Sequence, residues 1–312
     1  MHRCIQLAMN GKLNAQPNPM VGAVIVSEDG RIIGEGYHVR CGEGHAEVNA
    51  FASVKQEDMP LLSKSTLYVS LEPCSHYGKT PPCADLIIQK GVQKVVIGTI
   101  DPFAKVQGRG IQKLRDAGIQ VKVGVCEQEC NELNKVFFTF HSKHRPFITL
   151  KWAQTNNGII GIIPDDKHKD TAICRLIISN DTTRAICHKR RAEHQAILVG
   201  RKTWELDCPS LNVRDWTGKD PQKVILGNGT TIEKVIEELY NNNIQSVLVE
   251  GGRETLQSFI DAGLWDEAYV EIGNKTYEAQ ENQTIIKAPV ISEFISQTET
   301  HFNGNTIIKY KH

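Results

Sequence analysis

The chain has 312 residues, about twice the usual length of a domain, so we expect two domains. Lysine plus arginine (36) balance aspartate plus glutamate (36), and the charges form no long block of one sign. This balance argues against a general binder of nucleic acids or membrane surfaces, and no run of about 18 apolar residues is present to span a bilayer. Small-molecule partners therefore fit best.

The cysteines and the first residues favour a reducing cytoplasm. The nine cysteines are odd in number and scattered, and residues 1–12 contain no long apolar core of the kind that a secretory signal needs. Cys126 and Cys130 are four residues apart in a segment that favours a helix, so we expect them on one helix face. We favour core packing for this pair over a second metal site, because no histidine pair accompanies them.

The first half of the chain alternates helices and strands, which predicts an α/β layered domain. A helix over residues 1–10 is followed by two strands, 21–27 and 31–38, which the turn signal Glu28-Asp29-Gly30 joins as a hairpin. The further expected elements are a helix at 45–54, a strand at 66–70, a helix at 83–90 closed by Gly91, a strand at 94–100, a helix at 110–118 and a strand at 119–125.

A polar stretch that ends in proline, residues 141–146, interrupts this alternation and marks a domain boundary. The expected domains are therefore 1–144 and 145–312. The second half alternates as well: strands are expected at 146–153, 196–200, 223–227 and 246–250, and helices at about 231–241 and 255–263.

Four residues of the first domain supply the parts of a catalytic zinc site. His45 offers an imidazole nitrogen, and Cys74 and Cys83 offer thiolates, a set that suits tetrahedral zinc and leaves a fourth position open for water. Glu47 is the expected proton shuttle, as in zinc deaminases. Eight residues separate the two cysteines, instead of the two in the shorter deaminase motif, so we expect the intervening loop to bulge beside the metal.

The local sequence supports this site, although each residue alone has an ordinary explanation. His45 and Cys83 each precede an apolar helical run, and the positive end of a helix dipole favours a thiolate over a thiol. An isolated cysteine, however, is usually a small buried hydrophobe, and the tripeptide His-Ala-Glu is common. The zinc interpretation rests on the combination.

A second candidate site lies where the strand at 246–250 runs into Gly251-Gly252 and a helix. Backbone N–H groups can approach a pyrophosphate closely at such a turn, and the helix dipole favours the negative charge. A tight strand-to-helix turn without a ligand explains the paired glycines as well. No Gly-x-Gly-x-x-Gly fingerprint is present, so an ordinary Rossmann domain is not supported.

The first half resembles the deaminase half of the bifunctional deaminase-reductases of riboflavin biosynthesis. The resemblance rests on residues 17–22 (PNPMVG), His45-Ala46-Glu47, residues 72–83 with their long cysteine loop, Asp101-Pro102 and Gly108-Arg109-Gly110. It implies a cytidine-deaminase-like three-layer domain with a mixed sheet.

The second half resembles the reductase domain of the same family, which has a dihydrofolate-reductase-like α/β fold and uses NADPH. The resemblance rests on Lys151, Arg191-Ala192-Glu193, Gly200 with Thr203 and Asp207, residues 209–214, and Glu250-Gly251-Gly252. Two positions depart from the family pattern, because Ile177 stands where tryptophan is usual and Cys208 where aspartate or asparagine is usual.

The resemblance also implies contacts residue by residue. For NADPH it implies Gln154, Thr203, Asp207, Gly252, Arg253, Glu254, Thr255, Leu256, Gln257 and Ser258. For the substrates it implies Asn18, His76, Lys79 and Thr80 in the first domain and Lys151, Arg191, Leu211, Arg214 and Glu250 in the second.

The implied substrate is a phosphorylated pyrimidine, 2,5-diamino-6-(5-phosphoribosylamino)pyrimidin-4(3H)-one. Zinc-activated hydroxide would replace its amino group, with Glu47 passing the proton to the departing ammonia, to give 5-amino-6-(5-phosphoribosylamino)uracil. NADPH would then reduce the ribosyl group to a ribityl chain. We expect a homo-oligomer with no nucleic-acid or membrane partner.

Three other interpretations stay open. A nucleobase or transfer-RNA deaminase would share the zinc chemistry but needs a basic surface, which zero net charge disfavours. A deaminase with a degenerate reductase half would explain Ile177 and Cys208. A zinc-stabilised binding protein without catalysis is disfavoured by the intact set of three ligands and Glu47.

Overall fold

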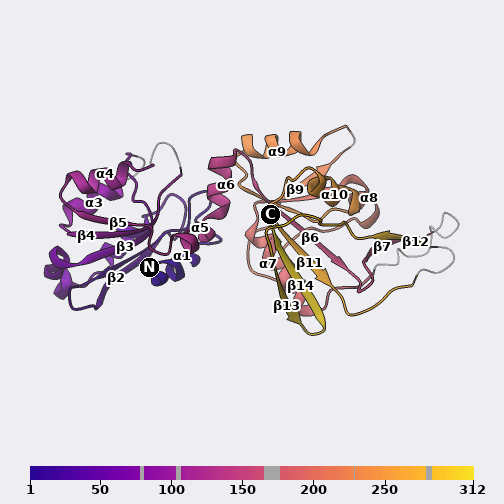
Figure 1. Cartoon of the computed structure of the whole chain (residues 1–312), viewed down its shortest axis with the longest axis horizontal. Helices are drawn as coiled ribbons and strands as arrows, with labels where there is room; N and C mark the ends of the chain where they lie inside the picture. The colour runs from indigo at the N-terminus through magenta and orange to yellow at the C-terminus, as the bar shows by residue number, and fades with distance from the viewer. Residues whose placement is uncertain (78–80, 103–106, 165–175, 228, 279–282) are drawn as a thin grey trace. The chain divides into compact units, whose positions relative to one another are not determined.

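A computed structural model of the chain describes residues 1–77, 81–102, 107–164, 176–227, 229–278 and 283–312. Over these residues the chain divides into two compact units, Met1–His144 and Arg145–His312. Each unit has its own sheet and its own core (Figure 1), and each is described by itself. Among the described helices, none is both long enough and apolar enough to cross a membrane.

The first unit alternates helices and strands. Its helices are α1 (His2–Met9), α2 (Ala46–Ala52), α3 (Cys83–Gln89), α4 (Arg109–Asp116), α5 (Glu127–Leu133) and α6 (Lys135–Lys143), with a 3-10 helix η1 (Gln56–Lys64). Its strands are β1 (Gly22–Val26), β2 (Ile32–Tyr37), β3 (Thr66–Leu71), β4 (Lys94–Thr99) and β5 (Gln120–Val123). The elements predicted before residue 126 are present to within a few residues at each end, and η1 is an addition to them.

The five strands form one mixed sheet in the order β2-β1-β3-β4-β5. Strand β1 is antiparallel to β2 and β3, whereas β3, β4 and β5 are parallel. Because side chains alternate along a strand, Ile25 packs with Phe51 of α2 on one face, and Val24 packs with Leu7 of α1 on the other. Helices on both faces give the predicted three layers.

The segment around Cys126 differs from the prediction of a single helix. It forms two helices, α5 and α6, that meet at Asn134, whose buried amide accepts from the Met20 N–H at 2.8 Å and donates to the Met20 carbonyl at 2.9 Å. Cys130 is fully buried, as core packing predicts. Cys126 lies outside the helix as the N-cap of α5, with φ 55° and a half-buried side chain.

The second unit is also an α/β unit. Its helices are α7 (Asp181–Glu193), α8 (Arg201–Asp207), α9 (Ile232–Asn241) and α10 (Arg253–Asp261). Its strands are β6 (Phe147–Gln154), β7 (Ile159–Pro164), β8 (Ala196–Gly200), β9 (Gln222–Leu226), β10 (Ser246–Val249), β11 (Glu267–Ile272), β12 (Gln283–Lys287), β13 (Ser296–Phe302) and β14 (Asn305–Lys311). The predicted elements are present, and the helices α7 and α8, the strand β7 and the strands after residue 263 are additions to them.

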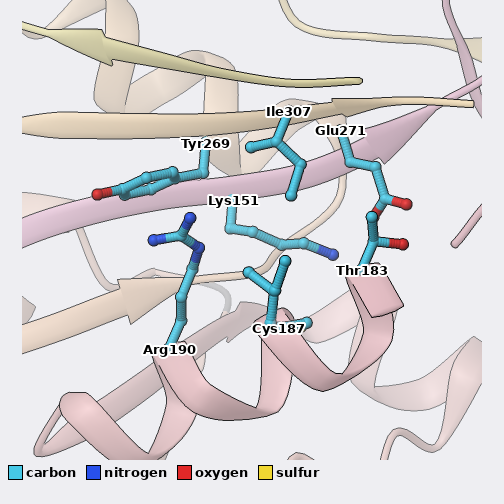
Figure 2. Close-up of a pocket in the computed structure, with 8 residues that line it drawn as sticks. Lys151, Thr183, Cys187, Arg190, Tyr269, Glu271 and Ile307 are labelled. Atoms are coloured by element: carbon cyan, nitrogen blue, oxygen red, sulfur yellow. The ribbon is translucent and has the colours of Figure 1, made fainter. Parts of the chain in front are cut away.

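Seven of these strands form a sheet in the order β13-β14-β11-β6-β10-β8-β9, and β12 pairs with β7 in a separate ribbon. The strands β11, β6, β10, β8 and β9 are parallel to one another, and β14 is antiparallel to both β11 and β13. Leu150 and Trp152 of β6 join the core with Phe259 of α10. Lys151, between them, faces the other side of the sheet, where it lies against Cys187 of α7 (Figure 2).

Arg145 and Asp266 form a buried ion pair at the start of the second unit. The two guanidinium Nη atoms of Arg145 donate to the Asp266 carboxylate at 2.6 and 2.8 Å, and the Ile148 N–H donates to it at 2.9 Å. The two side chains are 13% and 7% exposed, so the pair is largely out of water. It fixes the start of β6 to the start of β11.

Replacing Arg145 with alanine should lower the free energy of unfolding of the second unit by about 3 to 5 kcal/mol, because a buried carboxylate then loses its cation. All four tryptophans of the chain follow residue 145, so tryptophan fluorescence during urea denaturation reports on this unit. Arg201→Ala, which breaks the exposed pair of Arg201 with Glu205, is the control and should cost about 0.5 kcal/mol or less. Equal effects of the two variants would contradict the prediction.

Candidate active site

His45, Cys74 and Cys83 converge in the first unit. His45 is the N-cap of α2, Cys83 is the first residue of α3, and Cys74 lies in the loop after β3. His45 Nδ1 lies 3.3 Å from Cys83 Sγ and 3.6 Å from Cys74 Sγ, and the three ligand atoms all lie within 4.8 Å of one another. One nitrogen and two sulfurs at this spacing fit a zinc ion with a fourth position left for water.

The two cysteine ligands have pKa values that are shifted in opposite directions. A hydrogen bond from the Cys83 thiol lowers the pKa of Cys74 to about 4, and the same bond raises the pKa of Cys83. The hydrogen bond between His45 and Cys74 raises the pKa of the imidazole. The backbone N–H of Cys83 also donates to Cys74 Sγ at 3.3 Å. A thiolate is therefore already favoured at Cys74, and binding of a divalent cation would displace the remaining protons.

Glu47 lies in the first turn of α2, two residues after His45, and is only 3% exposed. Burial raises the pKa of its carboxyl group, and the negative charge of Cys74 raises it further. A carboxyl group with a raised pKa beside a metal site is suited to take up a proton and return it. The structure thus places Glu47 beside the three ligand residues.

His38 is a member of the site that sequence reasoning missed. Its ring packs edge-on against the His45 ring, with centroids 5.5 Å apart and an interplanar angle of 85°. Burial lowers the pKa of His38, which favours the neutral ring. The two ring nitrogens lie 3.1 Å from Asn18 Nδ2 and 3.2 Å from the Gly44 carbonyl, so a ring protonated on Nδ1 donates to Gly44 and accepts from Asn18. This chain of contacts holds Asn18 beside His45.

Of the other predicted substrate residues of this unit, His76 lies among the described residues. His76 is exposed in the loop between the two cysteines. Lys79 and Thr80 lie outside the described residues, so their roles stay predictions from sequence.

A second group of potential ligands surrounds Cys126. The ligand atoms of His2, Cys126 and Glu129 lie within 4.8 Å of one another, although the sequence had placed no histidine near this cysteine. His2 and Glu129 are exposed, and such surface groups are common without a metal. We assign no ion to them.

In the second unit, Glu250 and Arg191 form a buried bidentate pair at the end of β10. Arg191 donates from Nε at 2.9 Å and from Nη2 at 2.6 Å to the two carboxylate oxygens, and from Nη1 at 3.1 Å to the Asn212 carbonyl. Burial alone would raise the pKa of Glu250, but the hydrogen bonds and charge of Arg191, together with the charge of Lys151, lower it. Glu250 is therefore ionised at neutral pH.

Lys151 reaches from β6 into a pocket between the sheet and α7. Figure 2 shows its side chain running toward Thr183 and Glu271. Burial opposes the charge of this lysine, but Cys187, Glu250 and Glu271 outweigh it and raise the pKa of Lys151. The pocket thus contains a partly buried ammonium group that is fully protonated.

The predicted substrate residues Leu211 and Arg214 lie in the loop after α8. Leu211 is buried with φ 52°, so its side chain packs in the core. Arg214 is exposed, and its Nη1 donates to the Asn212 side chain at 3.0 Å. His188 of α7, a second residue that the sequence did not single out, accepts the backbone N–H of Arg214 at 3.3 Å. This contact ties the loop to α7.

The paired glycines form a close turn between β10 and α10. A Cβ at Gly251 would lie 2.9 Å from the Thr255 Cβ, and one at Gly252 would lie 3.0 Å from the Thr203 Oγ1, which accepts the Gly252 N–H at 2.9 Å. A larger residue at either position would require a neighbouring side chain to shift, so packing alone already favours glycine here. The turn also leads directly to the N-terminus of α10, whose N-cap Gly252 has no side-chain cap. This is the geometry that a phosphate group requires.

Most other predicted cofactor residues have structural partners of their own. Gln154 accepts from Trp152 Nε1 at 2.8 Å, Glu254 pairs with Lys202 at 3.1 Å, and Gln257 and Ser258 donate to Asp261 and to the Thr255 carbonyl, each at 2.7 Å. Leu256 is buried in the core, and Arg253 and Asp207 are exposed. Contacts from residues 252–258 to a cofactor would therefore come mainly from backbone N–H groups.

A mixed-sheet unit with this ligand set and a buried glutamate is a zinc-dependent deaminase, and here it precedes an α/β unit of the reductase type. The family model described as cytidine and deoxycytidylate deaminase zinc-binding region matches residues 1–99, and that of the RibD C-terminal domain matches residues 146–234 and 229–277. Riboflavin biosynthesis protein RibD of Aquifex aeolicus is 37% identical and covers 88% of this chain and 86% of its own. The chain belongs to this family.

Two further relatives agree. RibD of Bacillus amyloliquefaciens is 36% identical over 86% of this chain and 82% of its own. The crystal structure of a diaminohydroxyphosphoribosylaminopyrimidine deaminase/5-amino-6-(5-phosphoribosylamino)uracil reductase from Thermotoga maritima superposes with a TM-score of 0.83, at 32% identity, over 100% of this chain and 97% of that one. The predicted family, fold class and cofactors, zinc and NADPH, are confirmed. A degenerate reductase half and a non-catalytic zinc protein are not favoured.

Proposed function

We propose that the first unit removes the amino group from 2,5-diamino-6-(5-phosphoribosylamino)pyrimidin-4(3H)-one and that the second unit reduces the ribosyl group of the product. The convergence of His45, Cys74 and Cys83 beside the buried carboxyl group of Glu47 carries this proposal. Membership of the deaminase-reductase family supports both steps.

In the deamination, zinc bound by His45, Cys74 and Cys83 would supply Lewis acidity that activates water. Glu47 takes a proton and later delivers it to the amine that leaves as ammonia. The Asn18 amide, held by His38, lies beside the ligands and can hydrogen-bond an edge of the pyrimidine ring. Exclusion of water from the buried carboxyl group keeps this proton within the site.

In the reduction, NADPH would supply the hydride that opens the ribosyl group to a ribityl chain. Glu250 immediately precedes the Gly251-Gly252 turn, so the substrate residue and the cofactor turn share one strand end. Lys151 is a charged donor in the adjacent pocket and is suited to hold sugar oxygens. Lys151 on β6, which pairs with β10, and Glu250 directly after β10 support a site in which the two reactants meet.

The two arginines that are predicted substrate residues of the second unit are suited to different tasks. Arg191 is committed to Glu250 and to the Asn212 carbonyl, so it orients Glu250 rather than binding phosphate with its whole fork. Arg214 is exposed and makes one side-chain contact that is described, with Asn212. We therefore propose Arg214 as the main phosphate contact.

A cytoplasmic homo-oligomer remains our proposal for the state of the protein in the cell. The cysteines in the described part of the chain are all free, which supports a reducing compartment.

Incubation of purified protein with the diamino substrate, followed by mass analysis, tests both halves at once. Without NADPH the product should differ from the substrate by the net replacement of NH with O, because water is added and ammonia is released. With NADPH it should also gain two hydrogen atoms, matched by an equal amount of oxidised cofactor. Ammonia release without NADPH oxidation would refute the proposed reduction.

Glu47→Gln should retain zinc but lose deamination by a factor of about 100 or more, because the amide cannot carry the proton. Metal analysis gives the zinc content, and ammonia release gives the rate. The exposed Glu43→Gln, four residues away, is the control and should retain the normal rate. Near-normal turnover of Glu47→Gln would show that another group moves the proton.

Arg214→Ala should raise the Michaelis constant of the reduction for the phosphorylated intermediate by about tenfold, and the constant for the dephosphorylated intermediate far less, since a charge-assisted contact to phosphate is lost. Arg201→Ala, another exposed arginine of this unit, is the matched control. The same increase for both intermediates would rule out a phosphate contact.

A further inference from the structure

Glu72 is a buried carboxylate that the proposed reaction does not use. It directly precedes Pro73 and the zinc ligand Cys74, and it is only 4% exposed. Four backbone N–H groups donate to it, those of Asp101 at 3.3 Å and Gly108 at 3.0 Å to Oε2, and those of Gly110 at 3.0 Å and Ile111 at 3.3 Å to Oε1. Each carboxylate oxygen therefore faces two donors.

These four donors lie between the end of β4 and the first turn of α4. The first N–H groups of a helix have no partner within the helix, and those of Gly110 and Ile111 lie in the first turn of α4. The N-cap Gly108 has no side chain that could serve them. Glu72 therefore caps α4 from a different strand, and its negative charge lies at the positive end of the helix dipole.

The start of α4 also touches the chain next to Cys74 directly. A Cβ at Gly110 would lie 2.0 Å from the Pro73 carbonyl oxygen, so only glycine permits this approach. The Pro73 carbonyl and the Glu72 carboxylate therefore both lie against the start of α4. The proposed reaction gives no role to the Gly108-Arg109-Gly110 motif. Its glycines are explained by this close packing and by the N–H groups that bind Glu72.

We propose that Glu72 is a positioning residue for the metal site: its carboxylate locks the start of α4 onto Pro73 and thereby holds Cys74 Sγ where it meets His45 and Cys83. This inference rests on the proposed zinc-dependent function. A carboxylate is needed because glutamine would direct an NH2 group at two backbone N–H groups in either orientation of its amide. Residues that orient metal ligands typically change metal affinity by about 10- to 100-fold when they are replaced.

Glu72→Gln tests this inference in the full-length protein loaded with zinc. We expect zinc to pass to a colorimetric chelator about 10- to 100-fold faster than from the unchanged protein. Hydrogen exchange at Gly108, Gly110 and Ile111 should accelerate in the same variant, while NADPH-dependent reduction of the deaminated intermediate stays unchanged. Asp85→Asn is the matched control, because it removes the negative charge from the contact of Asp85 with Lys113, between α3 and α4, without touching Glu72.

The outcomes separate the inference from the function on which it rests. Unchanged protein that binds no zinc would overturn the proposed function, whatever the variants do. Zinc release from Glu72→Gln at the unchanged rate, or the same acceleration in Asp85→Asn, would overturn the positioning role. If Glu72→Gln does not fold, Glu72→Asp decides by the same assay, since a side chain shorter by one methylene group cannot reach both pairs of donors.

Discussion

A carboxylate that is taken out of water must be met by donors, and this requirement organises both units of the protein. Glu72 is met by four backbone N–H groups, Glu250 by the fork of Arg191, and Asp266 by the fork of Arg145. In each case the donors lie far along the chain from the acceptor. These contacts hold segments together that are distant in the sequence. Those of Glu72 and Glu250 join segments that carry the two sites, and that of Asp266 joins the first strand of the second unit to β11.

Both sites use the same local device, a strand end that leads toward the start of a helix. Strand β3 leads through Glu72 to Cys74 and then to Cys83 at the start of α3, and β10 leads through Glu250 to the N-terminus of α10. Parallel strands bring such ends to one edge of a sheet, where backbone N–H groups and helix dipoles are available. The deaminase and reductase sites therefore differ in their side chains but share the arrangement of a strand end before a helix.

The sequence predicted what depends on short spacing. A few consecutive residues determine each of the features that were predicted: the hairpin of β1 and β2, the helix starts at His45 and Cys83, and the glycine turn before α10. His38 and His188 were missed because their roles come from packing against residues outside their own segments. Strand β13 was missed because nearly all of its side chains are exposed, so no alternation marks it. The break between α5 and α6 depends on the contact of Asn134 with Met20, which is 114 residues away.

The contact of Asn134 with Met20 has a consequence for anyone who wishes to excise the first unit. The match to the deaminase family model ends at residue 99. The backbone amides that hold Glu72 begin at Asp101, and the side chain that holds Met20, near Asn18, is that of Asn134. A fragment cut at the end of this match would retain every metal ligand while losing the supports that aim them. Asp101 and Asn134 both lie in the compact unit Met1–His144, so a fragment that keeps these supports must extend at least to Asn134.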